Sequence, residues 1–265
     1  MPRHRNLGWQ PQLPDHRDLV YAAPMGAVLP PAVDLRPRMP SVYDQGQIGS
    51  CTANATDAIV QFLLRPAETD TPWFPGSRLF IYYNTRAAEG TIGCDSGGSL
   101  RDAIKSVAAF GVPAETAWPY SGAAAREDGT FPPGAAASLK PSKAVYEAAA
   151  VAKAVNYSAV PQMLSHLKGC LAEGFPIAFG FTIYSSFYGV GDVPTIDVPM
   201  PKPDVGVEGG HAVVAVGYVD ASEQFIIRNS WGPGVQDDGY FYLPYGYVTN
   251  PNLASDFWTI RKVSP

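Results

Sequence analysis

The chain has 265 residues, of which 46% are hydrophobic and 16% charged, and its net charge is −5. It is long enough to bury a sizeable core as one large domain or two ordinary ones. The charges are scattered, which argues against a nucleic-acid-binding surface, and no stretch approaches the ~20 apolar residues of a membrane span. We therefore expect neither a nucleic-acid partner nor a membrane partner.

The N-terminal segment, residues 1–29, is rich in proline, aspartate and arginine. Its basic start is not followed by the apolar run of roughly 7 to 15 residues that a secretion signal requires. We therefore expect a cytoplasmic protein, or one secreted without such a signal.

The first half of the chain predicts helices. Apolar residues recur at helical spacing over residues 51–64, 77–86 and 99–110. The third of these helices should end at Gly111, shortly before Pro113, because glycine and proline commonly follow a helix C-terminus.

The second half predicts strands. Alternating or continuous apolar runs, rich in β-branched and aromatic residues, cover residues 177–183, 211–218, 224–228, 240–243 and 257–263. One helix, at 161–173, interrupts them, and residues 189–210 are predicted to form a surface loop. The expected fold class is α+β, helical over about 36–143 and β-rich over 144–262.

Cys51 begins the first predicted helix. A glycine-punctuated turn precedes it, in which Ser50 is a candidate N-cap. A helix N-terminus stabilises the thiolate, which is the nucleophilic form of cysteine. Taken alone, a cysteine at such a place is more often an inert core residue.

Two later strings supply the groups that a cysteine nucleophile needs. GGHA at 209–212 provides the imidazole of His211, and RNSWG at 228–232 provides the amide of Asn229, which can orient an imidazole. Gln45, upstream of Cys51, supplies a second amide. Together these residues point to acyl transfer through a cysteine.

On these residues the chain resembles the papain-like cysteine peptidases. Gln45 precedes Cys51 as the family's oxyanion glutamine precedes its nucleophile, and His211 and Asn229 open strings similar to the family's own. Three further strings match in the same order, namely GCDSGG at 93–98, WPY at 118–120 and GFPI at 174–177. The resemblance covers roughly residues 30–262, and such signatures are specific to their family.

The resemblance implies two domains with the active-site cleft between them. The left domain is helical and the right domain is β-barrel-like, so that Cys51 and His211 lie on opposite walls. Residues 30–265 form the peptidase unit. Residues 1–29 then remain as an extension, either a strap on the surface of one domain or a short plug over the cleft.

The resemblance also implies a role for each site residue. Cys51 attacks the scissile carbonyl as a thiolate and forms a thioester acyl-enzyme, and His211 protonates the leaving amine. Asn229 orients His211, Trp231 shields that hydrogen bond, and Gln45 stabilises the oxyanion together with the backbone of Cys51. Two alternatives stay open: Trp231 as a core residue only, and Gln47 in place of Gln45.

Substrate binding is expected along both walls of the cleft, at Gly97, Gly98, Ser99, Leu100, Gly180, Gly209, Gly210 and Trp231. The substrate backbone should pair with Gly98. The pocket for the second residue before the scissile bond should be deep, because two of its walls lack side chains. No acidic residue maps to its base, so that Leu, Phe or Tyr should be preferred there.

The chain departs from the family pattern at Ile48, which replaces a cysteine and leaves Cys94 without its usual disulfide partner. The resemblance places Cys170 on the right domain, too far from Cys94 to pair. We therefore expect three free thiols, with Cys94 and Cys170 buried, and a reducing environment.

The expected activity is hydrolysis of peptide or protein substrates by a monomer that needs no cofactor and no metal. Two other functions remain: an amidase or acyltransferase that uses the same Cys–His pair, and a catalytically silent peptide-binding module. The sequence leaves open whether the enzyme is an endopeptidase or an exopeptidase.

Overall fold

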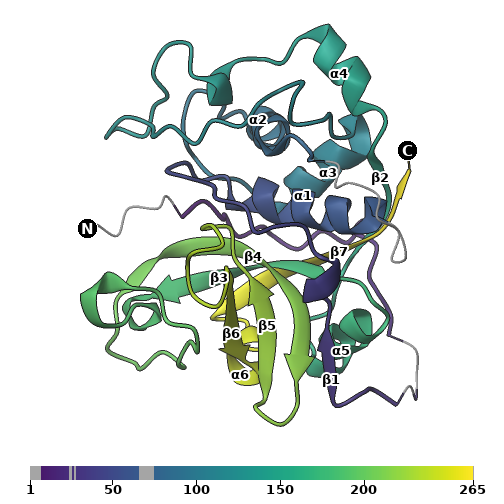
Figure 1. The fold of residues 1–265 in the computed structure, drawn as a ribbon, viewed down its shortest axis with the longest axis vertical. Coiled ribbons are helices and arrows are strands. Elements are labelled where there is room, and N and C mark those ends of the chain that lie inside the picture. The colour runs from purple at the N-terminus through teal and green to yellow at the C-terminus, as the bar shows by residue number, and fades with distance from the viewer. Residues whose placement is uncertain (1–6, 24–25, 27, 66–74, 265) are drawn as a thin grey trace.

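The computed structural model describes residues 7–23, 26, 28–65 and 75–264. Helices gather on one side of the molecule and an antiparallel sheet on the other, with α1 lying along the boundary between them (Figure 1). Within the predicted extension at residues 1–29, residues 1–6, 24, 25 and 27 lie outside the described part of the chain.

Among the described residues, the helical side contains four α-helices. They are α1 (Cys51–Leu64), α2 (Arg78–Glu89), α3 (Leu100–Phe110) and α4 (Lys143–Ala149). Two others lie with the sheet, α5 (Leu164–Ala172) and α6 (Tyr245–Val248). Short 3-10 helices occur at η1 (Arg36–Arg38), η2 (Ala136–Ser138), η3 (Ser185–Phe187) and η4 (Val190–Asp192).

The sheet contains β1 (Ala32–Asp34), β2 (Lys153–Ala159), β3 (Ile177–Tyr184), β4 (Val207–Val219), β5 (Gln224–Arg228), β6 (Tyr240–Pro244) and β7 (Ala254–Ser264). The strand order is β2-β7-β3-β4-β5-β6, with β1 paired to β4, and the pairs are antiparallel. The long strand β4 is central and brings His211 opposite Phe181 of β3.

The helix α1 is buried over most of its length, from Cys51 to Phe62. Small side chains such as Ala53 and Ala58 let it pack closely, and its contacts reach β4 and β7. Ser50 does not cap this helix. Its hydroxyl instead lies 2.5 Å from the Tyr120 hydroxyl, so that the start of α1 is fixed by a tertiary contact.

The α+β class and the predicted helices and strands are confirmed, with differences at their ends. β4 begins at Val207 and therefore takes the last residues of the predicted loop at 189–210. The short elements β1, β2, α4 and α6 were not predicted. α4 lies beside α2 (Figure 1), where the Tyr146 ring meets Phe80 at 4.9 Å between centroids.

All three cysteines are free thiols, but the prediction that Cys94 is buried is wrong. Cys170 is buried, whereas Cys94 is exposed. The interior beneath the Cys94 loop is filled by the buried Arg86, whose guanidinium donates to the carbonyls of Ile92 and Cys94, both at 3.0 Å. The loop is thus held by its backbone, and the thiol points to the surface.

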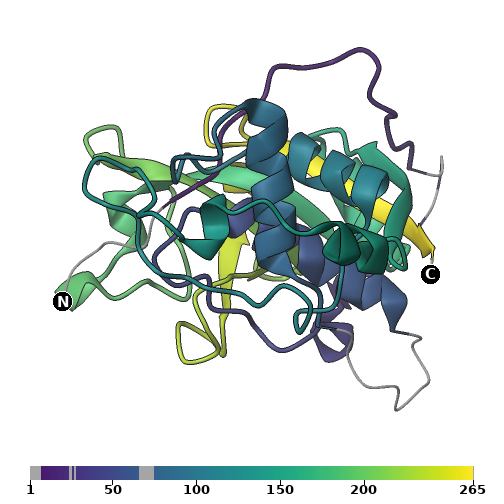
Figure 2. The ribbon, with the colours of Figure 1, turned by 90° about the horizontal axis from the view of Figure 1, so that it is seen from above.

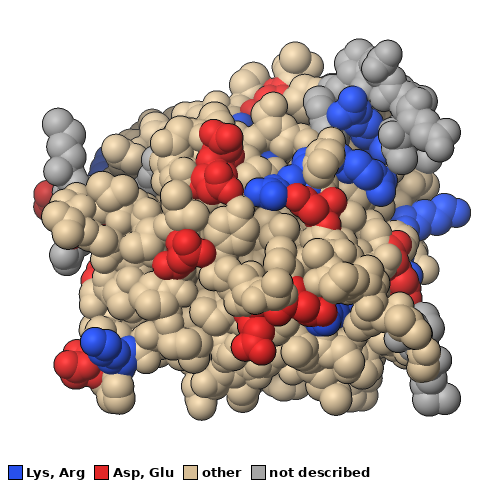
Figure 3. Space-filling view, turned by 60° about the horizontal axis from the view of Figure 1, so that its bottom comes forward, with Lys and Arg blue, Asp and Glu red and all other residues tan. Residues whose placement is uncertain are grey.

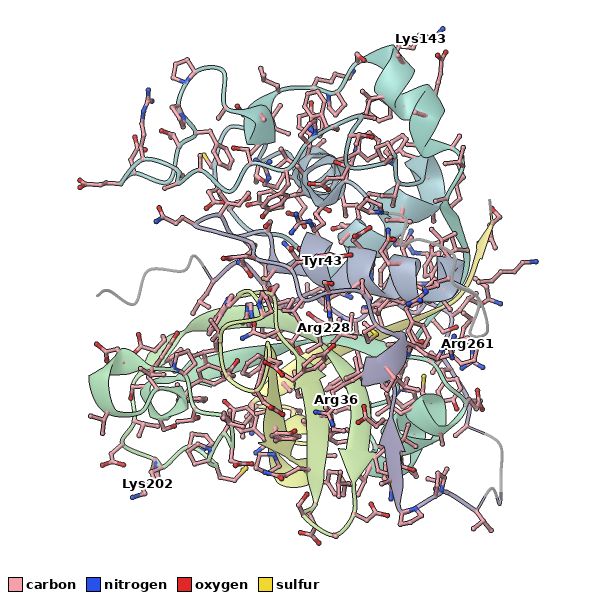
Figure 4. All side chains as sticks on the ribbon, viewed as in Figure 1. Arg36, Tyr43, Lys143, Lys202, Arg228 and Arg261 are labelled. Carbon is pink, nitrogen blue, oxygen red and sulfur yellow. The ribbon has the colours of Figure 1, made fainter. Side chains whose placement is uncertain are left out.

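A buried arginine joins the sheet to the segment that leads into α1. Arg228 of β5 donates to the carbonyls of Pro40 at 2.7 Å and Ser41 at 2.6 Å, and its guanidinium lies 5.1 Å from the centre of the Tyr43 ring. Figure 4 shows Arg228 and Tyr43 at the boundary of the two layers. On the face in Figure 3, acidic side chains are scattered over the middle and basic side chains lie mostly toward the upper right.

Candidate active site

Cys51 and His211 approach each other from the two layers. Cys51 is the first residue of α1 and His211 lies in β4, and neither is exposed. The backbone of Ala212, which follows His211, lies close enough to the Cys51 thiol to act on its pKa. The structure therefore brings the thiol to the strand that carries the imidazole.

Burial raises the pKa of the Cys51 thiol to about 11, although backbone hydrogen bonds from Ala212 and Gly8 act in the opposite direction. Desolvation disfavours the charged form of a thiol, and here it exceeds the effect of these donors. Gly8 belongs to the N-terminal segment, so this value describes a thiol that the segment covers.

The His211 ring is oriented by a chain of amides. His211 Nε2 lies 2.9 Å from Asn229 Oδ1, and Asn229 Nδ2 donates to Gln236 Oε1 at 2.8 Å. Gln236 Nε2 in turn donates to the carbonyl of Thr195 at 2.8 Å. Because Asn229 presents its oxygen to the ring, Nε2 carries the hydrogen of this bond.

Trp231 covers this hydrogen bond. Its ring stacks on His211 with centroids 4.9 Å apart and planes 29° from parallel, and Phe181 meets His211 edge-on at 6.0 Å. Trp231 also packs against Phe187, at 5.8 Å. The indole thus packs both in the core and against the imidazole.

Gln45 is buried beside the loop that precedes Cys51. Its Nε2 donates to the carbonyl of Ile48 at 3.0 Å, and its Oε1 accepts from the Ser230 hydroxyl at 2.7 Å. The Gln45 backbone also donates to the Ser230 carbonyl at 2.9 Å. Gln47, the alternative candidate, is exposed.

Asp95 connects the loop before Cys51 with the glycines of the predicted substrate-binding loop. Its carboxylate accepts from the Gly49 backbone at 2.9 and 3.1 Å and from the Tyr82 hydroxyl at 2.5 Å. The Tyr82 oxygen accepts from the Gly97 backbone at 3.2 Å. These bonds lie beside Ile48 and Cys94, where the family's usual disulfide is missing.

Residues 8–10 of the N-terminal segment lie in the cleft. Gly98 donates to the Gly8 carbonyl at 2.8 Å, Gln10 donates to the Gly98 carbonyl at 3.1 Å, and Trp9 donates to the Gly210 carbonyl at 3.1 Å. The segment passes between the helical layer and the sheet (Figure 1). It therefore contacts glycines predicted to bind substrate, among them Gly97, Gly98 and Gly210.

Glycine is required at position 8 by this close approach. A Cβ atom there would lie 1.9 Å from the Gly49 carbonyl oxygen, which is a backbone atom with little freedom to move. The segment therefore reaches the cysteine loop only because residue 8 has no side chain.

The Trp9 ring occupies a pocket formed by predicted substrate-binding positions. A Cβ at Gly180 would overlap the ring at 1.8 Å, and one at Gly210 would come within 2.8 Å of it. Gly209 instead faces Leu7. The expectation of a pocket without an acidic residue is wrong, because the Trp9 indole donates to Asp256 Oδ2 at 3.0 Å.

The following part of the segment packs on the outside of the molecule. Leu19 and Tyr21 exchange backbone hydrogen bonds with Ala159 at 2.8 Å each, and Asp18 forms a 2.6 Å ion pair with Arg101 of α3. Figure 2 shows this part running along one edge. The predicted strap and the predicted plug thus correspond to successive parts of the same segment.

The family model of the papain family cysteine proteases matches residues 29–258. The chain belongs to this family. It is therefore a papain-like cysteine peptidase, with the fold expected of one.

The solved structure of xylellain, a cysteine protease from Xylella fastidiosa, is 47% identical to this papain-family peptidase. It superimposes with a TM-score of 0.93, covering 98% of this chain and 97% of the other. An uncharacterized peptidase C1-like protein of Acanthamoeba polyphaga mimivirus is 37% identical over 98% of this chain and 88% of its own length. A cathepsin B-like protein of Giardia intestinalis is 32% identical over 84% of this chain and 73% of its own.

Sequence reasoning missed several residues that complete the site of this papain-family peptidase. Ser230 lies within the quoted RNSWG string, and its contact with Gln45 could have been suspected from that position. Gln236, Asp95 and Asp256 carry no local signal, because their partners are distant in the chain.

The described ranges, which omit 1–6, 24, 25, 27, 66–74 and 265, contain no group of three or more His, Cys, Asp or Glu side chains arranged to hold a metal ion. None of the helices within those ranges is long and apolar enough to cross a membrane.

Proposed function

We propose that the peptidase cleaves peptide bonds by acyl transfer to Cys51, with His211 exchanging the proton, Asn229 positioning His211 and Gln45 binding the oxyanion. The observation that carries this assignment is the 2.9 Å contact between His211 Nε2 and Asn229 Oδ1. It fixes the orientation of the ring and leaves to Nδ1 the proposed proton exchange with the thiol.

The reaction begins with a proton moving from the Cys51 sulfur to His211. The thiolate then attacks the scissile carbonyl, and the carbonyl oxygen becomes an oxyanion stabilised by Gln45 Nε2 and the Cys51 backbone N–H. His211 returns its proton to the leaving amine, which leaves a thioester on Cys51. Water activated by His211 then hydrolyses the thioester and restores the thiol.

The packing supports these roles. Ser230 holds Gln45 Oε1, which turns the amide nitrogen toward the loop before Cys51. Removing one oxyanion donor commonly reduces the rate ~10² to 10³-fold. We therefore expect Gln45→Ala to lose this much in kcat.

We further propose that the described form of the enzyme is latent, because residues 8–10 occupy the cleft. Residues 8–10 hold the backbone of Gly98 and Gly210, so a peptide substrate and this segment compete for the same hydrogen-bonding groups. Activity then requires displacement of these residues, whereas the outer part of the segment remains attached.

The test is hydrolysis of a fluorogenic peptide together with labelling by an epoxysuccinyl inhibitor. Cys51→Ala and His211→Ala should abolish turnover, and Asn229→Ala should leave a measurable remnant, because orientation contributes less than the nucleophile and proton shuttle. Labelling should map to Cys51. Turnover retained by Cys51→Ala would overturn the assignment.

A further inference from the structure

The loop before α1 rests on a series of hydrogen bonds that begins at α2. Arg78, the first residue of α2, donates through Nη1 to Asn54 Oδ1 at 3.0 Å, and Asn54 Nδ2 donates to the Ser50 hydroxyl at 3.0 Å. The Ser50 hydroxyl lies 2.5 Å from the Tyr120 hydroxyl, which donates to the Gln45 carbonyl at 2.9 Å. These five residues, which we call the Arg78 network, connect a cation to the backbone of Gln45.

Every bond in the Arg78 network has a defined direction. Tyr120 donates its only proton to a carbonyl, so the Ser50 hydroxyl donates to Tyr120 and accepts from Asn54. Burial raises the pKa of Tyr120 to about 12, so this hydroxyl keeps the proton that it donates. Hydrogen bonds aligned in one direction polarise and strengthen one another inside a protein.

The Arg78 guanidinium is held between two aromatic rings. It lies 4.0 Å from the centre of the Tyr120 ring and 4.6 Å from that of the Tyr43 ring, and the side chain is 14% exposed. Nη2 lies 3.5 Å from Glu115 Oε1, which also accepts the Tyr120 backbone N–H at 2.8 Å. Stacking and ion pairing thus fix the first donor of the network.

Two members of the network occupy places that other residue types would suit better. Asn54 is 1% exposed within α1, although asparagine is a weaker helix former than alanine or leucine. Ser50 precedes α1, but its hydroxyl is used in the network and does not cap the helix. The stability of α1 therefore does not explain these residues, whereas a network that ends at Gln45 does.

We propose that Arg78 is a positioning residue for the amide of Gln45 that binds the oxyanion. The proposal rests on the proposed function, in which Gln45 Nε2 and the Cys51 backbone N–H stabilise the oxyanion. The network joins Ser50, the residue before Cys51, to the backbone of Gln45, and so it fixes the spacing of these two donors. Without it, the loop lets the Gln45 amide move away from the place where the oxyanion forms.

The test measures kcat of the full-length chain on one fluorogenic peptide, per active site titrated with an epoxysuccinyl inhibitor. Arg78→Met keeps the stem of the side chain and removes the donor. We expect kcat to fall about tenfold and KM to change less than about twofold, because the oxyanion forms only after the substrate has bound. Arg261→Met is the matched control and should keep kcat, since Arg261 also stacks on a ring, that of Phe175 at 3.8 Å, and pairs with Glu173.

A double variant separates positioning from a purely structural role. In a Gln45→Ala chain, adding Arg78→Met should lower kcat by less than about a further twofold, because the amide that Arg78 positions is absent. A further loss of about tenfold in that background, or an unchanged kcat in Arg78→Met alone, would overturn the proposal.

Tyr120→Phe covers the case in which Arg78→Met does not fold, because it removes only the hydroxyl that donates to Gln45. It should show the same loss of kcat and the same dependence on Gln45. Tyr146→Phe, which removes a hydroxyl bound to Asn84 at 2.7 Å, should keep kcat. Parental kcat in Tyr120→Phe would show that the network does not position the amide. Failure of the proposed function looks different: Gln45→Ala by itself would then retain the kcat of the parent.

Discussion

At the scale of single residues, the orientation of the His211 ring depends on a chain of hydrogen-bonded amide side chains. Asn229 presents its oxygen to His211 only while its own nitrogen is bound by Gln236, and Gln236 is itself held by the Thr195 carbonyl. Gln236 has a backbone φ of 60°, in the left-handed region that few residues other than glycine adopt. Residues in such strained conformations cluster at functional sites.

Gln236→Ala should therefore reduce kcat about tenfold, because it leaves the Asn229 nitrogen without its acceptor and lets the amide rotate. Gln236→Glu keeps an acceptor for Asn229 and should retain more of the rate. Steady-state kinetics on one peptide decides this, and equal kcat in the alanine variant and the parent would contradict it.

Asp95 is the second residue whose effect should reach the nucleophile. Asp95→Ala removes the acceptor of the Gly49 backbone and of Tyr82, so we expect kcat/KM to fall roughly tenfold, as for loss of a charged hydrogen-bond acceptor. Asp95→Asn keeps an oxygen at that place and should lose less. If both variants lose activity equally, the negative charge rather than the hydrogen bonds is required.

At the scale of elements, the N-terminal segment is expected to control access to the cleft. Gly8→Ala should raise peptidase activity about tenfold, because the added methyl group meets the Gly49 backbone and overpacking typically costs ~1 to 3 kcal/mol. Leu13→Ala, in the same segment but 85% exposed, is the matched control and should have no effect. Initial rates of peptide hydrolysis by full-length proteins measure both.

The same opening should change the reactivity of Cys51. In the closed form burial raises the thiol pKa to about 11, so alkylation by iodoacetamide should be slow at pH 7 and should accelerate as the pH rises toward 11. In Gly8→Ala the segment no longer covers the thiol, so its alkylation should become fast at neutral pH. Identical pH profiles for the two proteins would show that the segment does not cover the thiol in solution.

At the scale of the whole molecule, the two layers are joined by buried polar contacts as well as by apolar packing. Arg228→Met leaves the Pro40 and Ser41 carbonyls without their donor and should lower the free energy of unfolding by about 2 to 4 kcal/mol. Lys202→Met, at an exposed position shown in Figure 4, should change it by less than about 0.5 kcal/mol. Urea denaturation gives both values, and similar midpoints would mean that Arg228 does not contribute to joining the layers.

The sequence by itself predicted most of the helices and strands and supplied a set of candidate site residues. The helices and strands follow from periodicity, which is a local property, and α1 and β5 have the predicted bounds. The candidate residues Cys51, His211 and Asn229 were recognised from short strings, because each role needs one residue type within a local motif.

Only the tertiary structure decided what surrounds these residues. The Trp9 indole meets Asp256 across almost the whole length of the chain, and Gly8 reaches Gly49 through a backbone contact that leaves no pattern in composition. The exposure of Cys94 is likewise a tertiary property, because the Arg86 side chain fills the space beneath the Cys94 loop. Local patterns determine which groups are present, whereas long-range packing determines which of them are covered, paired or open to a substrate.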